Sequence, residues 1–244
     1  MLKGIYDAAS GMLPQIVRQD VVANNLANAG TAGFKRELVF SQEFTKAQQK
    51  TLNKQVDWEK VQITGVTIDF SQGPIERTGN SLDLAIDGDA FFVISTPSGE
   101  MFTRCGNFAL SPDGELVTSD GYAVLSETGE ISVPGSQFVV DSQGQMTVEG
   151  KPVGTLRLVS FAQPYPLRRA APGLFAPVAG APAPTQPENF VVIQGALERA
   201  NVNLINEMVQ MIESYRHFET AQRMVQIQDE SLDKAINQLG VLRG

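Results

Sequence analysis

A long stretch of regular apolar spacing near the C-terminus constrains this chain of 244 residues more than any other feature of its sequence. Between residues 204 and 239, positions recur at alternating steps of four and three, and nine of the eleven positions are apolar. This spacing is typical of a helix that packs along another helix as a coiled coil. The seam positions are Leu204, Met208, Met211, Tyr215, Phe218, Gln222, Val225, Asp229, Leu232, Ile236 and Leu239.

The N-terminal segment carries the same spacing and is the natural partner of the C-terminal helix. Pro14 interrupts it, because a proline inside a helix removes a backbone donor and clashes with the preceding turn. We therefore expect a kink or a restart there, with the better helix over residues 14–29 and a stop at Asn28-Ala29-Gly30. The N-terminal seam positions are Ile5, Ala9, Met12, Ile16, Gln19, Ala23 and Leu26.

Short apolar runs separated by glycine-containing turns fill residues 65–160. Strands this short and close predict antiparallel pairing, since a parallel crossover needs a dozen or more residues. Seven prolines between 164 and 187 predict an irregular return, and the polar residues 36–64 predict either a short helix around 46–62 or an extended arm. The predicted strands cover residues 82–86, 90–96, 101–104, 116–118, 123–125, 138–140, 146–148 and 155–159.

Together these patterns predict an α+β fold. A discontinuous coiled-coil module of N- and C-terminal helices encloses a central antiparallel all-β domain, joined by an irregular connecting arm. We assign residues 1–35 to the N-terminal helix, 36–70 to the arm, 71–187 to the β domain, and 188–244 to the return segment and long C-terminal helix.

The apolar stripe of the C-terminal helix is broader than one partner helix would cover, because Ile205, Val209 and Ile212 widen it. Large exposed apolar surfaces usually mark interaction sites, so the stripe indicates assembly. The alternative is one wall of an intramolecular bundle. We expect residues 1–30 and 200–244 to be mobile in the monomer and to order on assembly.

Composition excludes several classes of function. With 27 acidic against 19 basic side chains, the net charge of −8 argues against nucleic-acid binding, and no stretch is long and apolar enough for a membrane-spanning helix. A single Cys105 cannot form an internal disulfide, and a lone His217 leaves no second histidine for a zinc site. The N-terminus lacks an apolar signal-peptide core, so composition alone indicates a cytosolic protein.

Few residues suggest chemistry, and we predict neither a cofactor nor a metal site. Asp83, Asp87 and Asp89 form the only tight carboxylate group, but their spacing fails the EF-hand pattern and suits turns. We interpret His217 as a surface or interface residue and Cys105 as a partly buried structural thiol. For Trp58, a contact anchor and local packing both stay open.

Three groups of segments carry motifs, namely residues 8–12, 20–28 and 31–36, then 78–93, 102–108 and 113–118, and finally 194–204 and 207–212. These motifs resemble those of the family of bacterial flagellar rod and hook proteins. Chain length and the run of residues 69–74 are most similar to the proximal-rod type, with the distal-rod type next. The sequence departs from the family pattern at Ala90, at Pro14 and over residues 214–219.

The resemblance implies a non-enzymatic structural subunit of the flagellar basal-body rod. Such proteins leave the cytosol through the flagellar type III export apparatus without a cleaved signal peptide, which overturns the cytosolic interpretation. They associate with themselves and with other rod proteins in a helical tube that crosses the periplasm and transmits torque, with the terminal helices inside and the β domain outside. The resemblance implies no nucleic-acid partner and no direct insertion into a membrane.

The terminal helices are therefore expected to supply the assembly interface. Asn24, Asn25 and Asn28 lie near a helix end, where capping or polar packing and hydrogen bonds between subunits are equally open. The alternatives in function are a distal-rod or hook-type axial subunit, a secreted β-rich enzyme such as a polysaccharide hydrolase with helical oligomerisation ends, and a cytosolic coiled-coil adaptor. The expected interface residues are Ile5, Met12, Ile16, Asn24, Asn25, Leu26, Asn28, Leu204, Met208, Met211, Tyr215, Phe218, Val225, Leu232, Ile236 and Leu239.

Overall fold

The computed structural model describes residues 2–42, 62–133 and 138–241, and it places side chains for residues 11–40, 65–133 and 138–234. The chain divides into two compact units, each built from separate stretches of sequence. Unit 1 comprises residues 1–27, 37–67 and 203–244, and unit 2 comprises residues 28–36 and 68–202. The chain therefore passes between the units four times.

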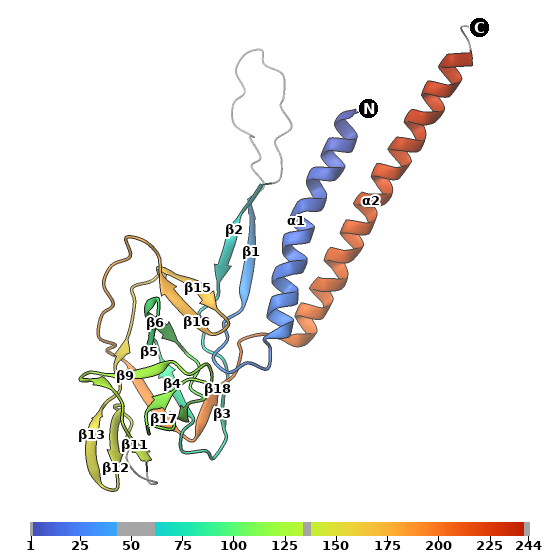
Figure 1. The fold of residues 1–244 in the computed structure, drawn as a ribbon. Coiled ribbons are helices and arrows are strands. Elements are labelled where there is room, and N and C mark those ends of the chain that lie inside the picture. Colours follow the sequence, from blue (N-terminus) through green and yellow to red (C-terminus); the bar gives the residue numbers. More distant parts are fainter. Residues whose placement is uncertain (1, 43–61, 134–137, 242–244) are drawn as a thin grey trace. The chain divides into compact units, whose positions relative to one another are not determined.

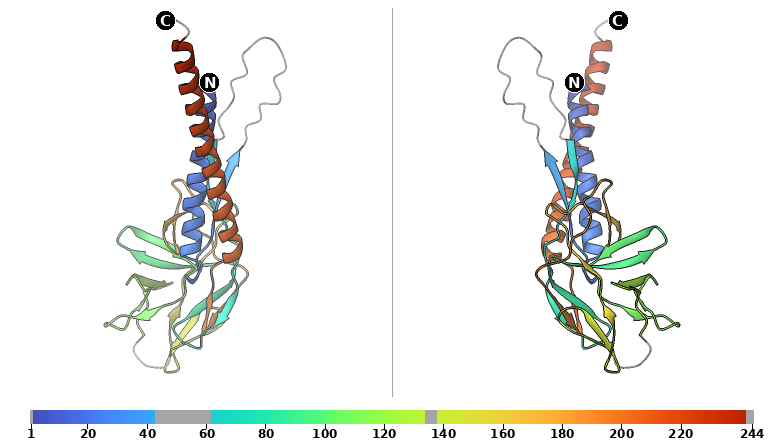
Figure 2. Two further views of the ribbon diagram at one scale, coloured as in Figure 1. Left: turned by 90° about the vertical axis from the view of Figure 1, so that its right-hand side faces the viewer. Right: turned by 90° about the vertical axis from the view of Figure 1, so that its left-hand side faces the viewer.

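Unit 1 is a pair of helices with a two-stranded ribbon. Helix α1 (Leu2–Ala27) and helix α2 (Leu204–Val241) lie side by side and run antiparallel, and β1 (Glu37–Gln42) pairs with β2 (Gln62–Ile68) and packs beside α1 (Figures 1 and 2). No helix in the described part of the chain has both the length and the apolar character needed to cross a membrane.

The restart predicted at Pro14 as the alternative to a kink is wrong. Helix α1 runs without interruption through Pro14 and ends at Ala27, just before the predicted stop. A proline inside a helix costs roughly 3 kcal/mol. Here α1 packs on both α2 and β1, and tertiary packing of this kind outweighs local helix propensity.

The two terminal helices pair as predicted, but the predicted coiled-coil register is not what the structure shows. Four predicted positions lie on the least exposed face of α2, while the other contacts fall one residue earlier than predicted, at 207 rather than 208 and at 214 rather than 215. Leu204, Met208 and Tyr215 are instead exposed. The less exposed face comprises Glu207, Met211, Ser214, Phe218, Ala221, Val225, Gln228 and Leu232.

Unit 2 is built from antiparallel sheets. Its largest sheet has nine strands in the order β15-β16-β6-β5-β9-β8-β7, with β10 added to β9 and β14 added to β5. These strands are β5 (Phe91–Thr96), β6 (Gly99–Thr103), β7 (Ala109–Leu110), β8 (Leu116–Val117), β9 (Ala123–Ser126), β10 (Gly129–Glu130), β14 (Leu158–Val159), β15 (Leu167–Ala171) and β16 (Leu174–Pro177).

Smaller sheets complete unit 2. A three-stranded sheet has the order β11-β12-β13, and two further pairs join β17 to β4 and β18 to β3. These strands are β3 (Ile75–Arg77), β4 (Leu84–Gly88), β11 (Phe138–Val140), β12 (Gln145–Val148), β13 (Lys151–Thr155), β17 (Phe190–Gln194) and β18 (Ala196–Glu198). The last two pairs place β17 and β18, near the end of unit 2, beside β4 and β3.

Strand β5 lies between the two hydrophobic cores of unit 2. Successive side chains of a strand point to opposite faces, so Phe92 and Ile94 enter one core while Phe91 and Val93 enter the other. All four side chains are almost fully buried. This explains why β5 is a continuous apolar run rather than an alternating one.

Every predicted strand has a counterpart in the structure, although residues 155–159 are divided between β13 and β14. The irregular return predicted over 164–187 is partly wrong, because β15 and β16 form a hairpin there. Pro172 and Gly173 make its turn, with Gly173 at a φ of 74°, and Pro177 ends β16. These prolines occupy turn and strand-end positions, where the missing N–H is tolerated. The short helix predicted around 46–62 lies outside the described residues except for Gln62, and so does Trp58. Of the arm predicted over 36–70, the described parts include β1 and β2.

Candidate assembly interface

An exposed apolar face at the start of α2 is the most prominent surface feature of unit 1. Its members are 49–74% exposed. Because they recur at helical spacings of three and four, they form one continuous stripe, separate from the buried face of α2. We call this stripe the α2 patch; it comprises Leu204, Ile205, Met208, Val209, Ile212 and Tyr215.

The structure distributes the expected interface residues over three environments. Ile16, Leu204, Met208 and Tyr215 are exposed, whereas Asn25 is buried. The side chains of Ile5, Ile236 and Leu239 lie outside those described. Partly buried positions are Met12, Asn24, Leu26, Asn28, Met211, Phe218, Val225 and Leu232. Whether any of these residues binds a neighbouring subunit stays a prediction.

Six further large apolar side chains of the two helices are exposed but were not among the expected interface residues, namely Leu13, Ile205, Val209, Ile212, Met224 and Ile227. The sequence indicates part of this set, because Ile205, Val209 and Ile212 widen the apolar stripe of α2 beyond its seam. The exposure of the residues on α2 depends on how α2 is rotated about its axis against α1. Residue spacing alone does not fix that rotation.

Asn25 joins α1, α2 and β1 within unit 1. Its Nδ2 donates to the Glu37 carbonyl oxygen (2.9 Å), while its Oδ1 accepts from the Glu37 N–H (2.8 Å). The same amide also donates to Glu207 Oε2 (3.3 Å). The side-chain amide of Asn25 thus bonds to both backbone groups of Glu37 in β1, as the backbone of a neighbouring strand would. Of the two roles left open for Asn25, the structure shows polar packing within the chain.

Replacing Asn25 with alanine is expected to lower the free energy of unfolding of unit 1 by about 1–3 kcal/mol, because the Glu37 N–H and carbonyl oxygen lose their bonds to Asn25 in a part-buried site. Urea unfolding measures this, and the Glu37 amide should exchange its hydrogen faster. Asn24→Ala is the control, since Asn24 is partly exposed and its bond to Glu37 Oε2 is long (3.4 Å). Equal losses for the two variants would contradict the assignment.

His217 lies on the exposed side of α2, at a cavity of about 290 Å³ within unit 1. The cavity is bounded by α1, β1 and α2, and Glu37, Glu213 and Arg18 also line it. This position fits a surface histidine.

A buried cluster of charges lies in unit 2. Lys35 Nζ is 2.6 Å from Glu198 Oε1, and Arg104 Nη1 is 3.5 Å from Glu198 Oε2. The side chains of all three residues are at most 3% exposed. The Gly73 N–H also donates to Glu198 Oε1 (2.8 Å), and Arg104 Nη2 donates to the Gly88 carbonyl oxygen (2.6 Å). Burial lowers the pKa of both Lys35 and Arg104, while the Glu198 carboxylate opposes that shift.

Asn201 and Asp69 extend this cluster to the ends of unit 2's segments. The Asn201 Oδ1 accepts from the Arg36 N–H (2.7 Å), and its Nδ2 donates to the carbonyl oxygens of Asp69 (2.8 Å) and Ser71 (3.0 Å). Burial raises the pKa of Asp69, but hydrogen bonds from Ser71 and the charge of Arg36 outweigh it and leave the pKa below its ordinary value. Residues beside three of the four passages between the units are therefore bonded to one another.

Residue 33 must be a glycine, because its backbone packs against the backbone just after the end of β6. Its φ is 65°, and a Cβ there would lie 2.3 Å from the Arg104 carbonyl carbon. The Gly33 N–H donates to the Glu198 carbonyl oxygen (2.7 Å). Only a residue without a side chain allows this approach.

Cys105 is partly buried, as the sequence predicts, and burial raises the pKa of its thiol to about 11. We expect native Cys105 to react with iodoacetamide at pH 8 roughly a hundredfold more slowly than a thiol of ordinary pKa, because the thiolate is the reactive form. Mass spectrometry of timed samples measures the rate. Protein unfolded in urea is the control and should react at the ordinary rate; equal rates would contradict the prediction.

The carboxylates near β4 have structural partners. The Asp83 carboxylate accepts from Thr78 Oγ1 (2.6 Å) and Asn80 Nδ2 (3.1 Å), and exposed Asp87 accepts from Gln72 Nε2 (3.1 Å). Across the residues that the structure describes, no group of three or more His, Cys, Asp or Glu side chains is arranged to hold a metal ion. Asp83 therefore serves the turn before β4.

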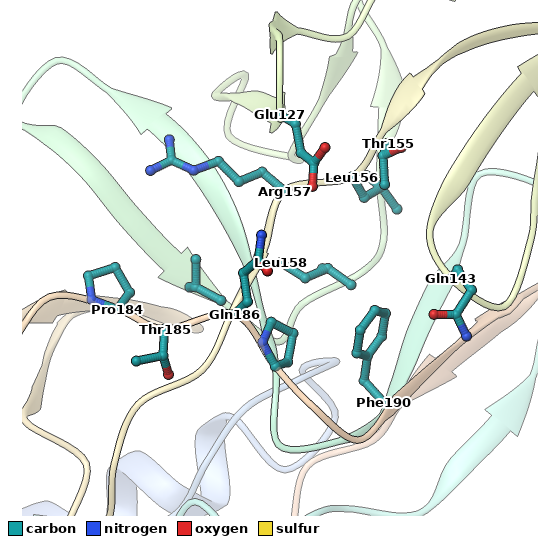
Figure 3. A pocket seen from close by; sticks show the side chains of 12 residues that line it. Glu127, Gln143, Thr155, Leu156, Arg157, Leu158, Pro184, Thr185, Gln186 and Phe190 are labelled. Carbon is teal, nitrogen blue, oxygen red and sulfur yellow. The ribbon is translucent and has the colours of Figure 1, made fainter.

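A surface cavity of about 550 Å³ in unit 2 is the natural place to look for a substrate (Figure 3). Its lining includes Phe190, Gln143, Arg157 and Glu127. Arg157 pairs with Glu100 through two contacts of 2.6 and 3.1 Å. Glu127 is the one carboxylate among the described residues that line the cavity, whereas glycoside hydrolysis uses a pair. The cavity thus lends no support to the alternative of a polysaccharide hydrolase.

Comparison with known proteins decides the family. The description "Flagella basal body rod protein" matches residues 5–35, "Flagellar hook protein FlgE/F/G D1 domain" matches 85–148, and "Flagellar basal body rod FlgEFG protein C-terminal" matches 193–239. The flagellar basal-body rod protein FlgF of Rhizobium meliloti is 33% identical over 98% of this chain and 99% of its own length. The chain belongs to the flagellar basal-body rod protein family.

Other members of the rod family are similar over most of the chain or part of it. FlgG of Bacillus subtilis is 32% identical over 97% of this chain and 99% of its own length. FlgF of Caulobacter vibrioides is 44% identical over 89 residues, which are 36% of either chain. The resemblance to rod proteins is thus confirmed for the FlgF/FlgG type, and this chain is a structural subunit of the flagellar basal-body rod.

The three matched regions of this rod protein meet in the buried cluster. Lys35 lies in the first region, Arg104 in the second and Glu198 in the third. The α2 patch also lies within the third region. The family pattern therefore covers both the cluster that holds unit 2 together and the exposed stripe of unit 1.

Proposed function

We propose that this chain assembles with itself and with other rod proteins through unit 1, in a helical tube that crosses the periplasm and transmits torque. The observation that carries the proposal is the α2 patch, six large apolar side chains left in water on a helix that the rod family matches. Because each is 49–74% exposed, burying it releases roughly 1–2 kcal/mol, and the six together are enough to drive association.

The contact we propose is heterologous: the α2 patch of one subunit packs on a different surface of the next subunit. A head-to-tail contact of this kind repeats without closing and builds a filament or tube. We also propose that the helices of unit 1 order fully only on assembly and line the inside of the tube, and that the proximal-rod position is this chain's place in it. The role is mechanical rather than enzymatic.

For reaching that location, we propose export by the flagellar type III apparatus with no cleaved signal peptide. Support comes from membership of the flagellar basal-body rod protein family. Mass spectrometry of basal bodies should recover the N-terminal peptide of the chain intact.

The turn between β11 and β12 offers a site for a direct test. Ser142 and Gln143 are exposed there, so a small tag should be tolerated. Electron microscopy of basal bodies from cells that make the tagged chain should show extra density along the rod. Swimming cells whose rods lack the tag would refute the proposed function.

A further inference from the structure

The surface cavity of unit 2 lies where two extended segments of the chain separate. The segments are joined at Ser160 and Thr185, where each backbone N–H donates to the other residue's carbonyl oxygen (2.8 and 2.9 Å). The next bonded pair of this antiparallel register would be Leu158 with Pro187. Because proline has no N–H to donate, that pair cannot form in full, and residues 155–159 and 184–187 line the cavity instead.

The backbone of Leu158 in β14 is left without a partner on the side of the cavity. The Val93 N–H of β5 donates to the Arg157 carbonyl oxygen (3.3 Å), and the backbone groups of successive residues in a strand point to opposite sides. The N–H and C=O of Leu158 therefore point away from β5, and neither has a hydrogen-bond partner in the described chain. Leu158 is only 8% exposed, and buried backbone groups are almost always paired, so this donor and this acceptor are available to a ligand.

Apolar and amide side chains surround the same space. Phe190 is half-buried and lines the cavity together with Pro184 and Pro187. Gln143 and Gln186 are exposed beside it, and their side-chain amides have no hydrogen-bond partner among the residues that the structure describes (Figure 3). Ligand sites typically combine apolar surface with a few polar groups that fix orientation. The lining therefore suits a ligand that carries both an apolar side chain and amide groups.

The uncompensated charge at the cavity is negative. Arg157 is neutralised by Glu100 through two contacts of 2.6 and 3.1 Å. The exposed carboxylate of Glu127 forms no ion pair with any described residue. A cationic group on the ligand is the electrostatic complement of that carboxylate.

We propose that this cavity binds a short extended peptide of a partner protein, with an apolar side chain on Phe190 and a lysine or arginine beside Glu127. The peptide pairs with Leu158 as an added strand, which is a recurring mode of peptide recognition. A saccharide presents mostly hydroxyl groups instead of the paired N–H and C=O of an extended backbone. The site lies in unit 2, so this inference goes beyond the proposed function, which concerns assembly through unit 1.

Selection from a phage-displayed library of random heptapeptides on the purified full chain tests the proposal. The library is first depleted on the Glu127→Lys variant, which removes peptides that bind other surfaces such as the α2 patch. Peptides enriched afterwards on the unchanged chain should carry Lys or Arg next to an apolar residue. In a titration with the most enriched peptide, Glu127→Lys should weaken binding at least about tenfold.

The matched control is Glu130→Lys. Glu130 is also an exposed glutamate, three residues along the same hairpin of β9 and β10, but it does not line the cavity. This variant adds the same positive charge, so it should bind the selected peptide as tightly as the unchanged chain does. Equal weakening by the two substitutions would overturn the proposal, because the effect would then come from the overall charge of unit 2.

Hydrogen exchange reads the backbone pairing directly. Saturation with the selected peptide should slow exchange of the Leu158 amide at least about tenfold, because that N–H gains an acceptor. The Ser160 amide already donates to the Thr185 carbonyl oxygen and should change less. An unchanged Leu158 amide in the saturated chain would overturn the added-strand contact.

Two further outcomes would also overturn the inference. One is the absence of any enriched peptide after depletion. The other is protection of the Leu158 amide by the N-acetylglucosamine trimer and not by peptide, which would show a saccharide site. The proposed function is decided separately, by the presence or absence in the rod of the chain tagged at Ser142.

Discussion

Replacing Glu198 with alanine is expected to lower the free energy of unfolding of unit 2 by about 3–5 kcal/mol, because Lys35 and Arg104 would then be buried without their counter-charge. The Gly73 N–H would lose its acceptor as well. Hydrogen exchange of the β5 amides as a function of urea concentration measures the loss in unit 2 specifically.

The control for this prediction is Glu100→Ala, which removes a glutamate from an ion pair with Arg157 at the surface. These side chains are 48% and 36% exposed, so water screens the pair, and the loss should be at most about 1 kcal/mol. Glu198→Gln keeps an acceptor for Gly73 and should fall between the two. If Glu198→Ala cost no more than Glu100→Ala, the buried cluster would not hold unit 2 together.

The second large effect is expected at Gly33, where alanine should destabilise unit 2 by at least about 3 kcal/mol. A φ of 65° strains any residue with a Cβ, and the added atom would lie 2.3 Å from the Arg104 carbonyl carbon, which is backbone and cannot rotate away. The segment must therefore shift, and the Gly33 bond to the Glu198 carbonyl oxygen shifts with it. The melting temperature from calorimetry and the same exchange measurement report the loss.

Two other glycines separate strain from crowding. Gly121 has a φ of 83° but open space around its Cα, so Gly121→Ala should show only the left-handed penalty, about 1–2 kcal/mol. Gly30 has neither a positive φ nor a close neighbour, so Gly30→Ala should be nearly neutral. A Gly33→Ala variant no less stable than Gly121→Ala would contradict the close approach that the structure shows.

How far the sequence predicts unit 2 depends on whether a feature is local. Each predicted strand between residues 82 and 159 is present because alternation and glycine turns act over a few neighbouring residues. The hairpin of β15 and β16 was missed because its prolines suggest irregular chain until the partner strand β6 supplies the pairing. Pairing with a strand that is distant in the sequence cannot be predicted from local composition.

The buried cluster of Lys35, Arg104 and Glu198 is the clearest feature that residue spacing could not predict. Lys35 and Glu198 lie 163 residues apart, and Arg104 and Glu198 lie 94 apart. In the sequence each resembles an ordinary surface charge, because charged residues are almost always exposed. The resemblance to rod proteins covers the segments around all three, yet it does not say that they meet.

The sequence by itself determined that both termini are helices, that antiparallel strands lie between them, and that the chain resembles the rod family, since these follow from local periodicity and motif order. Only the tertiary structure decided which side chains of α2 are covered. The Asn25 amide meets Glu207 rather than Met208, and every second contact position shifts by one residue, which leaves Leu204, Met208 and Tyr215 exposed. An apolar stripe wider than its partner permits several rotations, and a buried polar contact selects one because leaving it unpaired is costly.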